Sequence, residues 1–347
     1  MALVDRIRRG WNAFTNLKEP VPFENYGATY SSIMSDRSRP RFVNESSIVG
    51  SIYTRIAIDV SDAEFWHVRT DENGRFENDM ESGLNECLTK RANIDQAARA
   101  FRLDMALTLC DKGVIAIVPV DTSTDPTKSN SFDIHSLRVG EILEWYPRHV
   151  KVRVYNDRNG KKEELILPKA SIGIVENPLA SIMNAPNSML KRLIRKLHLL
   201  DAIDEQSGSG KLDIIIQLPY TIRSESRKQQ AEERRKNIEY QLRDSKYGIA
   251  YADATERITQ LNRPAENNLL NQITYLTNNL YSQLGLSEEV LNGTADEQTM
   301  LNYYTRTVEP IVEAIGQEMN TKFLTKTARS QRQKIMFHRD PFKLVPV

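Results

Sequence analysis

Residues 266–324 constrain the fold of this chain most strongly, because they carry two consecutive helical repeats of apolar side chains. In the first repeat, apolar side chains recur every three or four residues, at Leu269, Ile273, Leu276, Leu280 and Leu284. This spacing predicts a helix over residues 265–284 with one buried stripe. The second repeat predicts a long helix over residues 298–325. Its stripe consists of Leu301, Tyr304, Val308, Ile311, Ile315, Met319 and Phe323.

Pro310 lies inside the second predicted helix. Proline removes a backbone donor and clashes with the preceding turn, so this helix either kinks here or consists of two pieces. Residues 285–297 are expected to join the two helices as a tight loop. In that loop Gly293 permits a positive φ, and Asp296 is placed to cap the following helix.

The same stretch lacks positive charge. No lysine or arginine occurs between Arg263 and Arg306, although the whole chain of 347 residues contains 47 of them. Five acidic residues fall inside this gap, namely Glu266, Glu288, Glu289, Asp296 and Glu297. The polar face of the first helix carries mainly amide and hydroxyl groups. A surface formed by this stretch is therefore expected to be neutral or acidic.

Composition excludes several classes of protein. The 47 basic and 46 acidic residues give a net charge of +1, so any affinity for nucleic acid must come from local clusters. Two cysteines, Cys87 and Cys110, are too few for a disulfide framework. No apolar run is long enough to span a bilayer, and the first residues lack the apolar core of a signal peptide. We therefore expect a soluble intracellular protein with no membrane partner.

The N-terminal half predicts an arm followed by an α+β domain. Residues 3–17 place four apolar side chains on one helical face, which favours a short helix that packs on its own or a neighbouring subunit over one that contacts a membrane. Residues 19–44 are rich in proline and serine and predict an extended arm or loop. Residues 45–186 alternate helical and strand patterns, and the alternation over 150–154 indicates an antiparallel sheet with one exposed face.

Residues 187–264 predict a helix followed by a small polar module. The helix covers residues 187–210, and its end is weakened by glycine and serine. The module over residues 211–264 is expected to contain a strand, a highly charged helix and a hairpin formed by residues 247–252 and 256–261. Because the chain leaves and returns, the helices on either side of the module are expected to lie side by side.

The sequence contains no recognisable catalytic or metal-binding motif. The segment from Gly208 to Gly210 lacks the Lys-Ser/Thr pair of a phosphate-binding loop and follows a helix instead of a strand. The five histidines form no pair at i and i+4, and His67, beside two aromatic residues, is expected to pack in the core. We therefore expect no enzymatic activity, no cofactor and no metal site.

The order of these elements resembles that of the portal proteins of long-tailed bacteriophages. Residues 284–293, LGLSEEVLNG, are similar to a turn motif of that family, and residues 305–320 are similar to its proline-containing helix. Residues 93–98, followed by Lys112 and Gly113, are similar to a helix and strand of the family, but Ile94 and Asp95 replace the proline-asparagine pair that is common there. The resemblance covers most of the chain.

This resemblance implies an α+β, portal-type fold that assembles into a dodecameric ring. Its parts would be an N-terminal arm (1–44), a wing (45–186), a first stem helix (187–210), a small α/β clip (211–264), a second stem helix (265–284), a tunnel loop (285–297), a long kinked wing helix (298–325) and a short crown or tail (326–347). DNA would be packaged through this ring at one capsid vertex and later ejected. The protein would be assembled in the host cytoplasm and located in the virion.

The resemblance also implies partners and contact residues. The partners would be further copies of this chain, double-stranded DNA, the terminase large subunit, the major capsid protein and a head-tail adaptor. The DNA channel would be lined by Glu288, Glu289, Asn292, Gly293 and Thr294 of the tunnel loop. The clip would bind partners through Arg227, Glu232, Arg234 and Arg235. A basic tail, either solvated or near DNA or the capsid, would contain Lys326, Arg329, Arg332 and Lys334.

Two other classes of protein share some of these features. A capsid scaffold or head-tail adaptor without a DNA channel would contain similar charged helices, but it would not need two helices joined by a cation-free loop. A nucleic-acid-processing enzyme would need clustered acids or histidines for a metal ion, and the sequence shows no such cluster.

Overall fold

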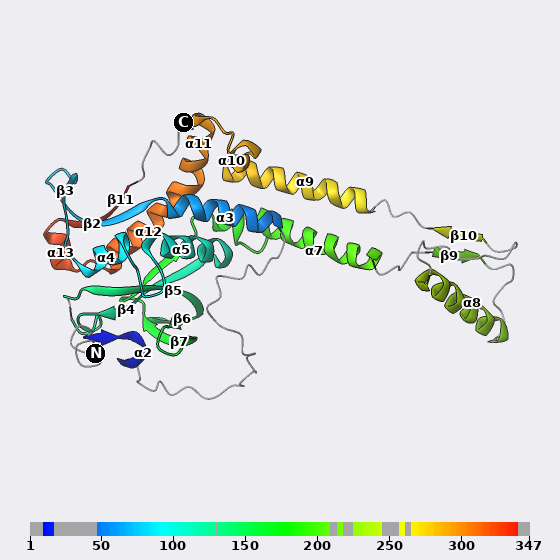
Figure 1. Cartoon of the computed structure of the whole chain (residues 1–347), viewed down its shortest axis with the longest axis horizontal. Coiled ribbons are helices and arrows are strands. Elements are labelled where there is room, and N and C mark those ends of the chain that lie inside the picture. The colour runs from blue at the N-terminus through cyan, green and yellow to red at the C-terminus, as the bar shows by residue number, and fades with distance from the viewer. Residues whose placement is uncertain are drawn as a thin grey trace. The chain divides into compact units, whose positions relative to one another are not determined.

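The computed structural model describes residues 10–16, 47–129, 131–208, 214–217, 225–244, 257–260 and 265–338. The chain forms two compact units. The first combines Met1–Lys191 with Asn279–Val347, and the second is Arg192–Asn278. Both units contain helices and antiparallel strands (Figure 1). The predicted α+β class is confirmed.

A six-stranded antiparallel sheet is the largest element of the first unit. Its strands follow the order β1-β4-β5-β6-β7, and β8 also pairs with β4. The strands are β1 (Trp11–Asn12), β4 (Val114–Thr122), β5 (Ile134–Trp145), β6 (His149–Asn156), β7 (Lys161–Pro168) and β8 (Gly173–Glu176). β5 includes Gly140, where an added Cβ would lie 3.0 Å from Val154. This glycine allows the strands to pack closely, although a glycine within a sequence usually suggests a break.

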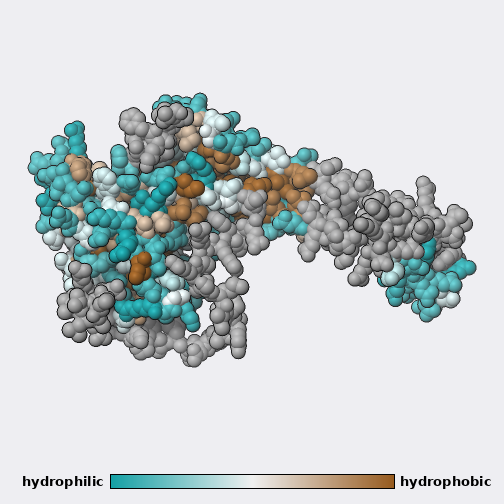
Figure 2. All heavy atoms as spheres, viewed as in Figure 1, coloured by the Kyte–Doolittle hydropathy of each residue, from teal (hydrophilic) through white to brown (hydrophobic). Residues whose placement is uncertain are grey.

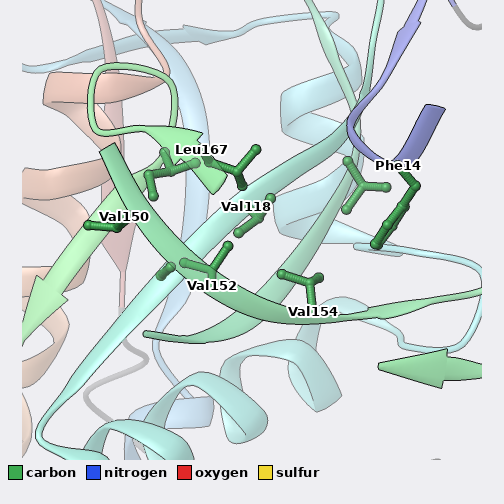
Figure 3. Close-up of a cluster of buried hydrophobic side chains, with 9 residues drawn as sticks. Phe14, Val118, Val150, Val152, Val154 and Leu167 are labelled. Carbon is green, nitrogen blue, oxygen red and sulfur yellow. The ribbon is translucent and has the colours of Figure 1, made fainter. Parts of the chain in front are cut away.

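One face of this sheet forms a hydrophobic cluster. Val150, Val152 and Val154 alternate along β6 and are completely buried, as the predicted period of two requires. Figure 3 shows them packed with side chains from neighbouring strands and with Phe14. The remaining buried members are Ala116, Val118, Val120, Leu167 and Ile172.

Three helices of the first unit lie before β4 in the sequence. They are α3 (Ser47–Ser61), α4 (Gly83–Thr89) and α5 (Ala98–Lys112). α3 packs against α5. α5 ends at Gly113, which has a φ of +80° and donates its backbone N–H to the carbonyl of Leu109. Glycine suits this left-handed cap, and a Cβ at this position would lie 2.8 Å from Asn184.

The second sheet of this unit joins distant parts of the sequence. Its order is β11-β2-β3, with β2 (Glu64–Thr70), β3 (Phe76–Asp79) and β11 (Gln333–His338). The side chain of Asn320 fixes β11, because it donates to the carbonyl of Ile335 at 2.7 Å and accepts from the Ile335 N–H at 2.8 Å. Residues 326–338, predicted as a crown or tail, therefore form α13 (Lys326–Ser330) and β11 and belong to the first unit.

His67 is buried in β2. Its two ring nitrogens hydrogen-bond to Ser82 at 2.8 Å and to Gln333 at 3.2 Å. Burial lowers the pKa of His67. The ring therefore connects β2 to the start of α4 and to β11, in agreement with the predicted packing role.

The predicted helix over residues 3–17 is wrong at Trp11 and Asn12. These residues form β1, which pairs antiparallel with Thr122 and Asp121 of β4, and only α2 (Ala13–Asn16) is helical. The reason is long-range, because the edge of β4 offers backbone partners that local periodicity does not reveal. Residues 1–9 and 17–46 lie outside the described residues.

The predicted long helix over residues 298–325 is divided into three parts. They are α11 (Glu297–Tyr303), the π-helical turn η1 (Tyr304–Val308) and α12 (Glu309–Lys322). Pro310 lies in the first turn of α12, where a missing backbone donor costs least. In η1 the N–H of Glu309 donates to the carbonyl of Tyr304, five residues earlier. The wider turn therefore precedes the proline and admits it without ending the helix.

The second unit contains most of two long helices and a small α/β part. Its elements are α7 (Met189–Gly208), β9 (Ile214–Gln217), α8 (Glu225–Asp244), β10 (Arg257–Gln260) and α9 (Ala265–Leu284). β9 and β10 pair antiparallel. The strand predicted over residues 247–252 lies outside the described residues. Among those described, no helix is sufficiently long and apolar to cross a membrane.

We predict that Ile335→Ala lowers the free energy of unfolding by about 2–5 kcal/mol, because it removes buried methyl groups. Ile335 is only 2% exposed, and the neighbouring Lys334 is exposed. Lys334→Ala is therefore the matched control and is expected to change stability little. Urea unfolding of the two variants measures the difference. Equal stability would contradict the inclusion of β11 in the core of the first unit.

Candidate functional site

The connection between α9 and α11 is the candidate functional site. It contains the short helix α10 (Glu288–Asn292), so the prediction of a simple tight loop is wrong. The five residues predicted to line a channel are all exposed here. They are Glu288, Glu289, Asn292, Gly293 and Thr294. Because Asp296 and Glu297 are also exposed, the connection presents four carboxylates and no cation.

Buried apolar side chains fix the connection from beneath. Leu284, Leu286, Val290 and Ala295 are at most 6% exposed. The hydroxyl of Thr307 donates to the carbonyl of Leu284 and links the end of α9 to η1. The backbone that carries the exposed polar side chains is therefore held in place by buried contacts.

Backbone and side-chain caps fold the connection locally. Ser287 begins α10 by accepting a hydrogen bond from the Val290 N–H at 3.3 Å. Gly293 ends α10 with a φ of +77°, and the N–H groups of Thr294 and Ala295 then donate to the carbonyl of Glu289 at 2.9 and 3.1 Å. This geometry explains why a glycine is required at 293.

Asp296 caps α11, as the sequence predicts. Its carboxylate accepts from the Thr299 N–H at 2.8 Å. Hydrogen bonds from the side chain and then the backbone of Thr299 lower the pKa of Asp296. A hydrogen bond with Ser287 likewise lowers the pKa of Glu289. Since hydrogen bonds favour the charged form of both groups, these carboxylates stay ionised at neutral pH. The connection is therefore an acidic surface.

Tyr303 anchors the connection to the rest of the first unit. Its hydroxyl donates to the carboxylate of Asp59 in α3 at 2.9 Å, and Arg55 binds the same carboxylate at 2.9 and 3.0 Å. Tyr303 is 1% exposed and Asp59 5%. Burial, followed by the charge of Asp59, raises the pKa of Tyr303 well above its ordinary value of 10. The hydroxyl therefore remains a neutral donor throughout the physiological pH range.

The predicted clip residues lie on α8 in the second unit. Arg227, Glu232 and Arg235 are exposed, and Arg234 is half-buried. Both signs of charge alternate along this helix, and Lys228 lies 3.7 Å from Glu225. Figure 2 shows a hydrophilic surface over α8. These residues therefore belong to a different unit from the acidic connection.

The predicted basic tail is a structured surface of the first unit. Lys326 and Arg329 lie on α13, Lys334 lies on β11, and Arg332 precedes β11 with a φ of +61°. All four side chains are exposed. Arg332 pairs with Glu72 in the β2–β3 hairpin at 2.9 Å. Sequence reasoning missed this acidic partner, because Glu72 is far away along the chain.

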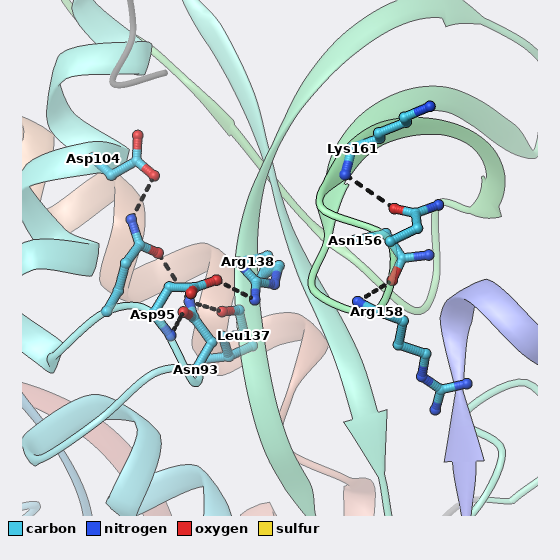
Figure 4. Close-up of polar contacts among 10 residues, drawn as sticks. Asn93, Asp95, Asp104, Leu137, Arg138, Asn156, Arg158 and Lys161 are labelled. Carbon is cyan, nitrogen blue, oxygen red and sulfur yellow. Dashed lines mark hydrogen bonds and ion pairs between the residues drawn. The ribbon is translucent and has the colours of Figure 1, made fainter. Parts of the chain in front are cut away.

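A second polar cluster was not predicted (Figure 4). The buried guanidinium of Arg138 lies 2.9 Å from Asp95, and Asn93 donates to the carbonyl of Leu137 at 2.9 Å. Gln96 donates to Asp104 at 2.9 Å, and burial raises the pKa of Asp104. These bonds fix the loop between α4 and α5 against β5. Within the described parts of the chain, no group of three or more His, Cys, Asp or Glu residues is placed to hold a metal ion.

We predict that Tyr303→Phe lowers the free energy of unfolding by about 1.5–3 kcal/mol, because it removes a buried hydrogen bond to a charged acceptor. Tyr240→Phe, at a tyrosine that is 68% exposed, is the matched control. Denaturant unfolding at pH 7 measures both changes. Equal stability of the two variants would contradict a role for Tyr303 as an anchor.

The same pair of proteins tests the pKa of Tyr303. Because its folded pKa is raised, the contribution of Tyr303 is fully present below pH 10 and is lost as the pH rises further. Phenylalanine does not titrate. The difference in stability between the wild type and Tyr303→Phe is therefore expected to shrink above pH 10. A difference that stays constant or grows at alkaline pH would show that the folded pKa is not raised.

We compared the sequence and the fold of the chain with those of known proteins. No protein-family model matches the sequence, and no curated protein matches it significantly. The chain is similar to the crystal structure of an HK97-family phage portal protein from Corynebacterium diphtheriae, with a TM-score of 0.54 and 13% identity over 87% of this chain and 95% of that chain. It also aligns with a chain from the neck of an empty gene transfer agent particle, with a TM-score of 0.47 and 11% identity over 86% of this chain and 82% of that chain. The first comparison confirms the predicted resemblance, and the chain therefore has the fold of a phage portal protein.

Proposed function

We propose that this chain is the portal subunit of a tailed phage. Copies of it form a ring at one capsid vertex, and DNA passes through the ring during packaging and ejection. The observation that carries this proposal is the fold, which matches a phage portal protein over 87% of the chain. A capsid scaffold or head-tail adaptor is less well supported, because neither accounts for a likeness that also covers 95% of that portal chain.

The acidic connection suits a channel for DNA. Each phosphate neutralised by lysine or arginine releases counterions and adds affinity, which would hold DNA in place. Residues 264–305 contain neither side chain. Asn292 and Thr294 are exposed between carboxylates, and we assign them to the bore together with Glu288, Glu289 and Gly293. Such a surface lets a polyanion slide past.

The remaining charged surfaces are assigned to partners. On α8, alternating charges at Arg227, Glu232, Arg234 and Arg235 suit contacts with neighbouring clips or with a head-tail adaptor and the terminase large subunit. Lys326, Arg329 and Lys334 form a basic surface for DNA or for the major capsid protein. Arg332 contributes less to it, since Glu72 already neutralises its charge. The protein acts in the virion after assembly in the host cytoplasm.

We predict that the purified protein forms closed rings of about twelve subunits, because identical head-to-tail interfaces close when their rotation permits it. Negative-stain electron microscopy measures the ring symmetry directly. Monomers or dimers alone, at micromolar concentration, would contradict the proposed function.

A second prediction concerns the charge of the connection. The double variant Asn292→Lys/Thr294→Lys adds two cations per subunit, so purified rings are expected to bind double-stranded DNA about 10-fold more tightly at low salt, with a steeper salt dependence. Virions carrying this variant are expected to contain less DNA.

The control is Asn73→Lys/Asn78→Lys, which adds the same charge to the exposed β2–β3 hairpin of the same unit. Fluorescence anisotropy measures DNA binding, and DNA content is measured in purified virions. Equal DNA content in virions of wild type and of the Asn292→Lys/Thr294→Lys variant would exclude the assignment of this connection to the bore.

A further inference from the structure

The helix α12 lies between the two sheets of the first unit (Figure 1). Asn320 on α12 hydrogen-bonds to β11 of the three-stranded sheet, and Glu318 hydrogen-bonds to the backbone of β8 in the six-stranded sheet. Two residues correspond to about 200° of rotation along a helix, so these side chains leave α12 in nearly opposite directions. One helix therefore contacts an edge strand of each sheet.

Ile335 is a residue of β11 whose backbone faces away from β2. The Thr70 N–H donates to the carbonyl of Arg332 at 2.9 Å, and hydrogen-bonded pairs alternate along antiparallel strands. Ile335 lies opposite His67, in a pair of the other kind, so its N–H and C=O point toward the free edge. The Asn320 side chain accepts from that N–H at 2.8 Å and donates to that C=O at 2.7 Å. It thus makes both hydrogen bonds that a further strand would make at this position.

Glu318 occupies one backbone group of β8 in the same way. The Asn177 N–H donates to the carbonyl of Gly113 at 2.8 Å. By the same alternation, Ile174 lies opposite Ala116 with its N–H at the outer edge of β8. Glu318 accepts from this N–H at 3.0 Å. A row of unpaired groups on an edge strand can pair with the strand of another chain, and Glu318 and Asn320 each interrupt such a row.

The sequences of the edge strands indicate where such protection is needed. β11 contains the apolar run 335–337 and no proline, and strands of this composition associate readily with one another. At the other ends of the two sheets lie β3 and β7. Charged side chains on an exposed edge discourage pairing with other chains, so the apolar strands β8 and β11 need a different protection. The charged residues are Glu77 and Asp79 in β3, and Lys161, Lys162, Glu163 and Glu164 in β7.

We propose that α12 guards both sheets against the addition of strands from other chains. Asn320 and Glu318 occupy outward-facing backbone groups of β11 and β8. The strand that they exclude is that of a second copy of this chain, because an apolar run pairs well with a run of the same kind and every copy carries one. This inference does not depend on the proposed function, since it concerns contacts within a single chain.

The test compares aggregation of variants of the purified full-length chain. Asn320→Ala removes both hydrogen bonds and leaves the edge of β11 open. It is expected to aggregate about 10-fold faster than the wild type, with a rise in thioflavin T fluorescence that reports added β-structure. The matched control removes buried carbon from the same helix at Ile315, which is fully buried, and leaves Asn320 in place. It is Ile315→Val or Ile315→Ala, whichever has the urea midpoint closer to that of Asn320→Ala.

A second variant, Asn320→Asp, separates protection of the edge from stability. Aspartate still accepts from the Ile335 N–H, but it cannot donate to the Ile335 carbonyl, so the chain is expected to be less stable than the wild type. Its carboxylate keeps the N–H occupied and adds a charge beside the edge. Aggregation of Asn320→Asp is therefore expected to stay close to the wild-type rate.

The outcomes are distinct. Aggregation of Asn320→Ala at the rate of the Ile315 control would overturn the proposal, because aggregation would then follow stability alone. Aggregation of Asn320→Asp as fast as that of Asn320→Ala would also overturn it. Neither result bears on ring formation by the wild type, which tests the proposed function separately.

The edge of β8 provides the same comparison if Asn320→Ala does not fold. Glu318→Ala exposes the Ile174 N–H, whereas Glu318→Gln keeps an acceptor for it. Faster aggregation of Glu318→Ala than of Glu318→Gln is expected. Equal rates for these two variants would contradict the guarding role of α12.

Discussion

The first unit depends on the return of the chain after residue 278. Several contacts bind the returning segment to residues that precede the second unit, and three of them are the following. Tyr303 hydrogen-bonds to the buried Asp59, Glu318 accepts from the backbone N–H of Ile174 at 3.0 Å, and β11 pairs with β2. The second unit is thus an insertion between two halves of one core. Its small β9–β10 sheet and α8 belong to a separate compact unit, while the acidic connection belongs to the first.

The acidic connection between α9 and α11 combines an exposed charged face with a firmly packed underside. Side chains beneath it are apolar and buried, and the caps at Ser287, Gly293 and Asp296 satisfy the backbone of two short helical turns. Only its outer face is polar, and that face has no cation. A connection of this kind presents the same charges at the same places in every copy, which a disordered loop would not do.

Sequence reasoning succeeded where structure is determined locally. The periodicity of α9, the cap at Asp296 and the alternation along β6 were all read correctly, because each depends on neighbouring residues. It failed where the local structure depends on residues that are distant in the sequence. β1 forms because β4 offers an edge, Arg332 is neutralised by Glu72, and the cluster around Arg138 requires a loop and a strand that are far apart in sequence. The π-helical turn before Pro310 was also missed. It contacts α3, and its Thr307 hydroxyl donates to the carbonyl of Leu284 at the end of α9, so its partners are distant in sequence as well.

The position of β11 also has a consequence for synthesis of the protein on the ribosome. β2 ends at Thr70, but its partner strand β11 begins only at Gln333. A nascent chain therefore exposes one edge of β2 until residues 333–338 have been made, and a chain that stops before them never covers that edge. The β11-β2-β3 sheet is completed by the last of its three strands to be synthesised.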